Sequence, residues 1–206
     1  EIYRMDIQGN TVRITNTPGN GGSMYAAPIP GGGLYFTSDR SGKNEIYRMD
    51  INGQTTQITN TPGDGTSWGA VPIAGGGLYF CSNRDGKTEI YRMDITGQTT
   101  RITNTPGDAA SWDPAPIASG GLYFTSGRNG RMEIYLMDTK GETTQITTTP
   151  DLGNSSGAAL IQGGGFYFTS NRDGKWEIYR MSADGTTNRI TNSPGDRESW
   201  GAVPPR

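Results

Sequence analysis

Residues 89–94 read Glu-Ile-Tyr-Arg-Met-Asp, and the same six-residue segment begins at Glu1 and Glu45. Close variants begin at Glu133 and Glu177, so the copies follow one another at a fixed offset of 44 residues. A second segment, Leu-Tyr-Phe or Phe-Tyr-Phe followed by Thr or Cys and then Ser, keeps the same offset; its copies begin at Leu34, Leu78, Leu122 and Phe166. A period in the forties with several short strands in each unit predicts stacked β-sheets rather than a helical solenoid.

Each 44-residue unit divides into four strands, which in the second complete copy lie around residues 69–73, 78–82, 89–94 and 99–103. Tyr, Phe, Ile and Thr favour the pleated backbone, and Asp-Gly and Asn-Gly steps between the segments tolerate positive φ angles. Gly or Pro interrupts the chain too often for three helical turns to form. The sequence therefore predicts an all-β fold, a β-propeller of four-stranded antiparallel blades.

The repeats predict about five blades in a single domain over residues 1–206. Four units are complete. Two strands of another unit lie around residues 2–15, and its first strand lies at residues 199–203. We expect these segments to combine into a fifth blade that lacks its second strand and is therefore incomplete. Residues outside this sequence, or a second chain, would be needed to complete this blade. The alternative is that the sequence is part of a propeller with more than five blades.

Composition and charge exclude several classes of partner. The formal net charge is −2, and Lys and Arg are spread evenly along the chain, which argues against nucleic acid. No stretch approaches the run of about 18 apolar residues that a membrane span requires, so we expect no membrane insertion. The only cysteine, Cys81, stands where other repeats have Thr, and one cysteine makes no disulfide framework.

Histidine is absent from the chain, which limits the chemistry that the sequence can predict. Residues 65–69 and 153–157 match the Gly-x-Ser-x-Gly pattern of a nucleophile elbow. That elbow requires a strand-to-helix turn and a histidine base. The repeats predict no helix after these segments, and the chain has no histidine. One cysteine and scattered carboxylates also do not make the usual ligand sets for zinc or calcium. We therefore expect no catalytic residues, no metal site and no cofactor, and the chain is predicted not to be an enzyme.

An arginine in one turn of each unit precedes the glutamate that opens the next strand. These arginines are Arg40, Arg84, Arg128 and Arg172. The pattern favours an ion pair across the hairpin or between blades, which would contribute about 0–1 kcal/mol if exposed.

The loop that leads from one unit into the next carries the candidate ligand residues. Its aromatic or apolar position holds Met24, Trp68, Trp112, Ser156 and Trp200, and the position four residues earlier holds Asn20, Asp64, Asp108, Leu152 and Asp196. Because neighbouring strands alternate in direction, these loops and the arginine-containing turns are expected on one face. An aromatic ring beside a carboxylate is typical of a surface that binds glycans or peptides. The candidate ligand-binding set is Trp68, Trp112, Trp200, Asp64, Asp108, Asp196, Met24 and Tyr25. The alternative is that each tryptophan packs between adjacent blades as part of the core.

The segment Ser82-Asn83-Arg84-Asp85-Gly86 followed by residues 89–94 resembles the WD40-like, or PD40, repeat of TolB-type propellers. The same pair of segments recurs at residues 170–174 and 177–181, and the resemblance extends over nearly the whole chain. The family usually has a Ser-Pro-Asp-Gly turn between the first two strands, whereas here that turn reads Ala74-Gly75-Gly76-Gly77. The resemblance implies a periplasmic or extracellular protein.

The function that the sequence favours is a non-catalytic binding scaffold of the TolB-like type, with a protein or peptide partner on one face or in the central channel. One alternative is a lectin-like module whose similar blades each hold a sugar, gaining avidity from multivalency. Another is the propeller domain of a larger secreted peptidase. A third is a repeat scaffold that is either engineered or recently duplicated. Cys81 and the irregular fourth repeat favour natural duplication over engineering.

Overall fold

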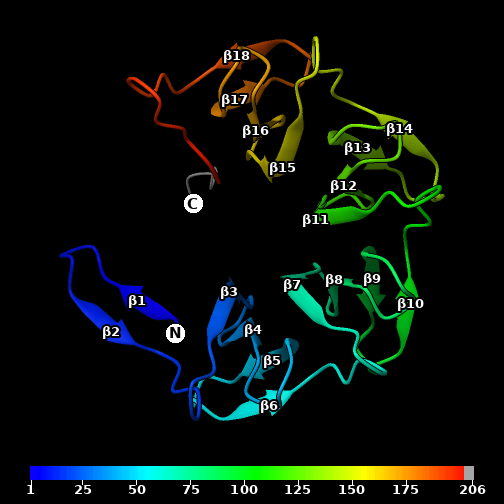
Figure 1. The fold of residues 1–206 in the computed structure, drawn as a ribbon. Helices are drawn as coiled ribbons and strands as arrows, with labels where there is room; N and C mark the ends of the chain where they lie inside the picture. Colours follow the sequence, from blue (N-terminus) through cyan, green and yellow to red (C-terminus); the bar gives the residue numbers. More distant parts are fainter. Residues whose placement is uncertain (202–206) are drawn as a thin grey trace. The chain divides into compact units, whose positions relative to one another are not determined.

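The computed structural model describes residues 1–201 (Figure 1). The chain divides into two compact units, the first over residues 1–102 and the second beginning at Thr103. The first unit contains β1 (Tyr3–Met5), β2 (Thr11–Arg13), β3 (Ser23–Pro28), β4 (Leu34–Ser38), β5 (Glu45–Met49), β6 (Thr55–Gln57), β7 (Ser67–Pro72), β8 (Leu78–Ser82), β9 (Glu89–Met93) and β10 (Thr99–Arg101). The second contains β11 (Ser111–Pro116), β12 (Leu122–Ser126), β13 (Glu133–Met137), β14 (Thr143–Gln145), β15 (Ser155–Leu160), β16 (Phe166–Ser170), β17 (Glu177–Met181) and β18 (Thr187–Arg189).

The strands form four antiparallel sheets of four strands each, β3–β6, β7–β10, β11–β14 and β15–β18, in which every strand pairs with its neighbour in sequence. The predicted all-β fold with four-stranded antiparallel blades is therefore confirmed. The last strand of each blade is shorter than expected; in the second blade it is Thr99–Arg101. In the part of the chain that the structure describes, no helix is long and apolar enough to span a membrane.

The predicted fifth blade is described only in part. Its two N-terminal strands form the pair β1–β2, as the repeat predicts. The expected C-terminal strand began at Ser199, but residues 199–201 are not in a strand, and the rest of that segment lies outside the described residues. The assembly of these segments into one blade, within a single domain over residues 1–206, remains a proposal.

Apolar side chains on the second strand of each blade make the core on both faces of the sheet. Phe80 on β8 is fully buried and stacks on Tyr91 of its own blade, with ring centroids 5.8 Å apart. The same cluster contains Ile46 of the preceding blade, and Tyr35 of that blade packs against it. In the second unit Phe168 and Tyr179 cluster with Ile134 in the same way. Neighbouring blades within a unit therefore share a core that a single blade could not bury alone.

A β-bulge interrupts the first strand of every four-stranded blade. In β11 the register moves from the pair Trp112–Thr125 to the pair Ala115–Tyr123, so that two residues of β11 face one residue of β12. The first bulged residue has a positive φ angle, which is 53° at Asp113 and 68° at Gly157 of β15. The amide of Gly157 donates a hydrogen bond of 3.0 Å to Oγ1 of Thr125 in the preceding blade. The bulge thus links neighbouring blades through the backbone.

The glycine-rich turn between the first two strands has a steric origin. Gly76 and Gly77 have φ angles of +106° and +84°, a region that favours glycine. A Cβ atom on Gly76 would overlap the Ile95 side chain, and one on Gly77 would overlap the carbonyl oxygen of Met93. The turn that leads from the third strand to the fourth therefore lies directly against these glycines. This contact accounts for the last two glycines of the Gly-Gly-Gly sequence, at the place where the TolB-type repeat usually has Ser-Pro-Asp-Gly.

Candidate functional site

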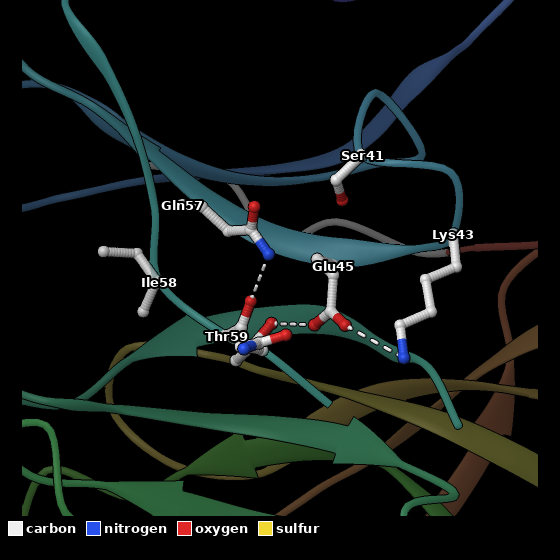
Figure 2. Close-up of a pocket in the computed structure, with 7 residues that line it drawn as sticks. Ser41, Lys43, Glu45, Gln57, Ile58 and Thr59 are labelled. Atoms are coloured by element: carbon white, nitrogen blue, oxygen red, sulfur yellow. Dashed lines mark hydrogen bonds and ion pairs between the residues drawn. The ribbon is translucent and has the colours of Figure 1, made fainter. Parts of the chain in front are cut away.

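A polar pocket of about 390 Å³ lies in the first unit, and the buried Glu45 is among the residues that line it (Figure 2). Oε2 of Glu45 accepts hydrogen bonds from the hydroxyls of Thr59 at 2.5 Å and Thr61 at 2.8 Å. Oε1 accepts the Thr61 amide at 2.8 Å and lies 3.8 Å from the Lys43 ammonium group. Both carboxylate oxygens are therefore already engaged by the chain, and Glu45 fastens the loop after β6 to the start of β5.

The hydrogen-bond network of Glu45 continues into the next blade. The Thr61 hydroxyl lies 2.7 Å from the hydroxyl of Ser67 on β7, and Ser67 donates to Ser82 on β8 at 3.0 Å. The guanidinium of Arg84 then donates to Ser82 and Ser67, both at 3.2 Å. Every member of this network is held by another member, so we interpret the pocket in Figure 2 as part of the connection between blades.

The expected ion pair between the turn arginine and the strand glutamate is wrong for Arg40, Arg84 and Arg172, whose guanidinium groups make none with the described residues. Each group instead lies over two aromatic rings of its own blade; in Arg84 it is 5.2 Å from the Phe80 centroid and 4.8 Å from that of Tyr91. The charge is stabilised by the π faces and by hydrogen bonds to serine hydroxyls.

The glutamate network makes the second unit sensitive to acid. Burial raises the pKa of Glu177, but hydrogen bonds from Thr191, the Ser193 amide and Arg189 outweigh it and lower the pKa to about 2, from 4.5. A lowered folded-state pKa stabilises the fold fully above the unfolded value, and this stabilisation is lost as the pH falls from 4.5 towards 2. We expect the thermal midpoint of the native chain to exceed that of Glu177→Gln at pH 7, and the difference to shrink steadily below pH 4.5. A difference that stays constant down to the lowest pH would contradict this assignment.

In the first unit, the structure places the predicted ligand residues at two neighbouring blades. Met24 and Tyr25 are consecutive on β3 and are 42% and 61% exposed. Trp68 is the second residue of β7, as Met24 is of β3, and it is half-buried. Asp64 is exposed in the loop before β7. Because β3 and β7 contact each other, Met24 and Trp68 lie at matching positions of adjacent blades.

In the second unit, Trp112 is half-buried on β11, and Asp108 and Asp196 are exposed in loops. Trp200 is 55% exposed and packs against Trp176, with ring centroids 4.4 Å apart. Trp176 lies in the turn before β17, so Trp200 contacts that turn while more than half of its surface stays exposed. The role of the whole candidate set in ligand binding remains a proposal.

A second pocket, of about 260 Å³, lies where the loop before β15 meets the turn after β16. We call it the rim pocket; its lining residues are Pro150, Asp151, Leu152, Gly153, Asn171, Arg172 and Gly174. Leu152 stands where three other repeats have Asp64, Asp108 and Asp196, and its side chain is 84% exposed. This departure from the repeat is visible in the sequence, whereas the pocket that Leu152 lines is found only in the structure.

Asp113 is a candidate functional residue that the sequence analysis missed. It occupies the bulge position of β11, where β7 and β15 have Gly69 and Gly157. Loss of contact with water raises the pKa of its carboxyl group, and a hydrogen bond from Thr125 lowers it. The available signal was a side chain at a position where other repeats have glycine. Among residues 1–201 no group of three or more His, Cys, Asp or Glu side chains could hold a metal ion.

No family model and no curated protein matches this sequence. Among solved structures, TolB from Acinetobacter baumannii matches with a TM-score of 0.78 and 21% identity, over 95% of this chain and 50% of that one. The putative TolB from Agrobacterium tumefaciens matches with a TM-score of 0.76 and 21% identity, over 93% of this chain and 68% of that one.

The chain has a TolB-like β-propeller fold. The resemblance that the repeats carry is thus confirmed for the fold. The chain spans about half the length of the Acinetobacter TolB, so the likeness concerns the blades alone.

The prediction that the chain is not an enzyme is wrong, because structures similar to this TolB-like fold include enzymes. A catalytically inactive variant of virginiamycin B lyase from Staphylococcus aureus matches with a TM-score of 0.72 and 15% identity, over 98% of this chain and 66% of that one. A puromycin hydrolase and a gluconolactonase from Xanthomonas campestris also match. The TolB-like fold by itself therefore does not exclude catalysis.

Proposed function

We propose that the chain is a TolB-like propeller module that binds a protein or peptide partner through the loops before the first strands and the turns after the second strands. In the second unit these segments line the rim pocket. The likeness to TolB supports this proposal at the level of the fold. The same likeness supports a periplasmic or extracellular location, which we include in the proposal.

The exposed leucine at the rim pocket is the observation that carries the proposal. In the repeats that have Asp at this position, the loop presents a carboxylate to water. Leu152 instead presents an apolar side chain that is 84% exposed, beside a pocket that Arg172 also lines. A leucine in water costs free energy that burial against a partner recovers, about 1.5–3 kcal/mol for a full side chain.

The arginine of the rim pocket adds polar recognition. Its Nε and Nη2 atoms donate to Ser170 and Ser155, and the group lies 4.8 Å from the Tyr179 centroid. Among the described residues its Nη1 atom has no hydrogen-bond partner. A peptide with an apolar side chain next to a carboxylate would match Leu152 and this free edge of the guanidinium.

The proposal is tested by selecting short linear peptides from a displayed library on the immobilised chain and measuring their dissociation constants by fluorescence anisotropy. Leu152→Asp restores the residue of the other repeats at an exposed site, so the fold is expected to persist. We expect this variant to bind selected peptides about tenfold more weakly, because the apolar contact is lost and a like charge meets the peptide carboxylate.

The matched control is Ile7→Asp, which removes a 98% exposed apolar side chain from a turn in the first unit. It is expected to leave peptide binding unchanged, and circular dichroism should show the same fold for both variants. Selection of no peptide, or equal binding by native chain and Leu152→Asp, would overturn the proposal. Signals on a glycan array in that case would favour the lectin-like alternative.

A further inference from the structure

The bulge position of the first strands holds a side chain in only two of the four-stranded blades. The residues at this position are Tyr25, Gly69, Asp113 and Gly157. Tyr25 and Asp113 both have φ angles of 53°, in the left-handed region where side chains are strained. Glycine adopts the same conformation at Gly69 and Gly157 without that strain. The two side chains therefore oppose the local backbone preference.

Neither side chain is needed to fill space in the fold. A Cβ atom placed on Gly69 or Gly157 would meet no other atom within 4 Å, so a side chain at this position points into open space. In agreement, Tyr25 and Asp113 are both exposed. A β-bulge is a device that redirects a side chain away from the sheet, and here the redirected side chains are a phenol and a carboxyl group. Strain without a packing role indicates a role in function.

Thr125 on β12, the adjacent strand of the same blade, contacts the carboxyl group of Asp113. The Gly157 amide donates to Oγ1 of Thr125, so the Thr125 hydroxyl hydrogen is directed elsewhere. It donates to Oδ2 of Asp113 over 3.5 Å, a long hydrogen bond that leaves most of the carboxylate free. Within the described part of the chain Asp113 forms no ion pair, and no cation contributes to its pKa.

The surroundings of Asp113 favour a positively charged ligand. Asp113 is exposed, and among the described residues the one hydrogen bond to its carboxylate is the long contact with Thr125, so the carboxylate can accept further donors. Trp112, the preceding residue, pairs in register with the same Thr125 and is half-buried. A carboxylate beside an indole face is a pairing that attracts guanidinium and ammonium groups.

We propose that Asp113 and Trp112 form a subsite for a cationic group, the side chain of an arginine or lysine in the bound partner. Asp113 supplies the counter-charge, Trp112 supplies the π face, and Thr125 positions the carboxylate. The assignment of this cation to a protein or peptide partner rests on the proposed function. The existence of a subsite for a cation does not depend on it.

The test uses ethylguanidinium chloride as the probe, titrated into the full isotope-labelled chain while amide and indole resonances are recorded by NMR. We expect the indole resonance of Trp112 and the amide of Asp113 to shift in a saturable way, and sodium propionate to leave them unchanged. Asp113→Asn is nearly isosteric and tolerates a positive φ angle, so it should fold. It is expected to weaken the response about tenfold, because a charge-assisted contact becomes a neutral one.

Two further variants separate a binding role from a structural one. Asp113→Gly places at this position the residue found at Gly69 and Gly157; we expect the same loss of response, with a thermal midpoint equal to or above that of the native chain. Glu142→Gln removes an exposed carboxylate from the turn before β14 and is expected to change nothing.

Undiminished shifts in Asp113→Asn, or no saturable shift in the native chain, would overturn the subsite. A subsite that responds to the probe while no peptide is selected would instead refute only the proposed function.

Discussion

Replacement of Glu133 by alanine is expected to lower the free energy of unfolding by about 3 kcal/mol or more. The Glu133 carboxylate is buried and accepts the hydroxyls of Thr147 at 2.5 Å and Thr149 at 2.9 Å, as well as the Thr149 amide at 2.7 Å. Alanine would leave these donors inside the protein without an acceptor. The loss should appear as a fall of roughly 10 °C in the thermal midpoint, measured by circular dichroism.

The change at Glu133 should also affect the rim pocket, because Thr149 directly precedes the pocket residues Pro150–Gly153. Amide hydrogen exchange in that loop is therefore expected to accelerate before the rest of the second unit is affected. Glu142→Gln, at an exposed glutamate, is the control and should leave the midpoint unchanged. A Glu133→Ala chain that unfolds within about 3 °C of the native chain would show that water replaces the carboxylate without loss.

Gly77→Ala is the second substitution for which we expect a large loss, again about 3 kcal/mol or more. The new Cβ atom would overlap the carbonyl oxygen of Met93, which belongs to the backbone and cannot rotate away. The chain would also have to keep alanine at a φ angle of +84°. Urea denaturation should show a lower midpoint concentration with little change in slope.

Gly75→Ala is a matched control in the same turn. Gly75 has a φ angle of +85°, and a Cβ atom there meets nothing within 4 Å. Its substitution therefore introduces the backbone strain without the overlap, and we expect a loss of about 1 kcal/mol. Equal losses in the two variants would mean that the contact between the two turns relaxes, contrary to the steric explanation of the glycine-rich sequence.

The fold was predictable from the sequence because its signals repeat. The alternation around Leu78–Ser82 and Glu89–Met93 recurs in every complete unit, so each strand is supported by its equivalents. The length of the last strand in each blade was overestimated. In the second blade the regular pairing ends at Arg101, and the Ile102 amide then donates a hydrogen bond to the carbonyl of Ile90 outside the ladder. Hydrophobic pattern does not carry information on where such a ladder ends.

The partners of polar side chains were less predictable than the strands. Opposite charges near each other in sequence favoured an ion pair at Arg84, but the rings of Phe80 and Tyr91 lie where a carboxylate was expected. The bulge that redirects Asp113 arises from the register between β11 and β12, which the sequence does not state. Leu152 was visible as a departure from the repeat, whereas the pocket beside it depends on how two loops meet.

The bond from the Gly157 amide to Thr125 spans 32 residues and joins its blade to the one before it. The same bond connects Gly69 to Thr37, and the networks of Glu45 and Glu133 likewise connect to the next blade. Excision or insertion of one whole repeat would therefore join equivalent positions. Wherever the preceding blade has threonine at the position of Thr125, the bond would find a counterpart of its former partner, whereas the blade with Cys81 lacks that hydroxyl. Recombination within the gene can thus change the copy number of blades in whole steps, while each junction inherits contacts that have already been selected.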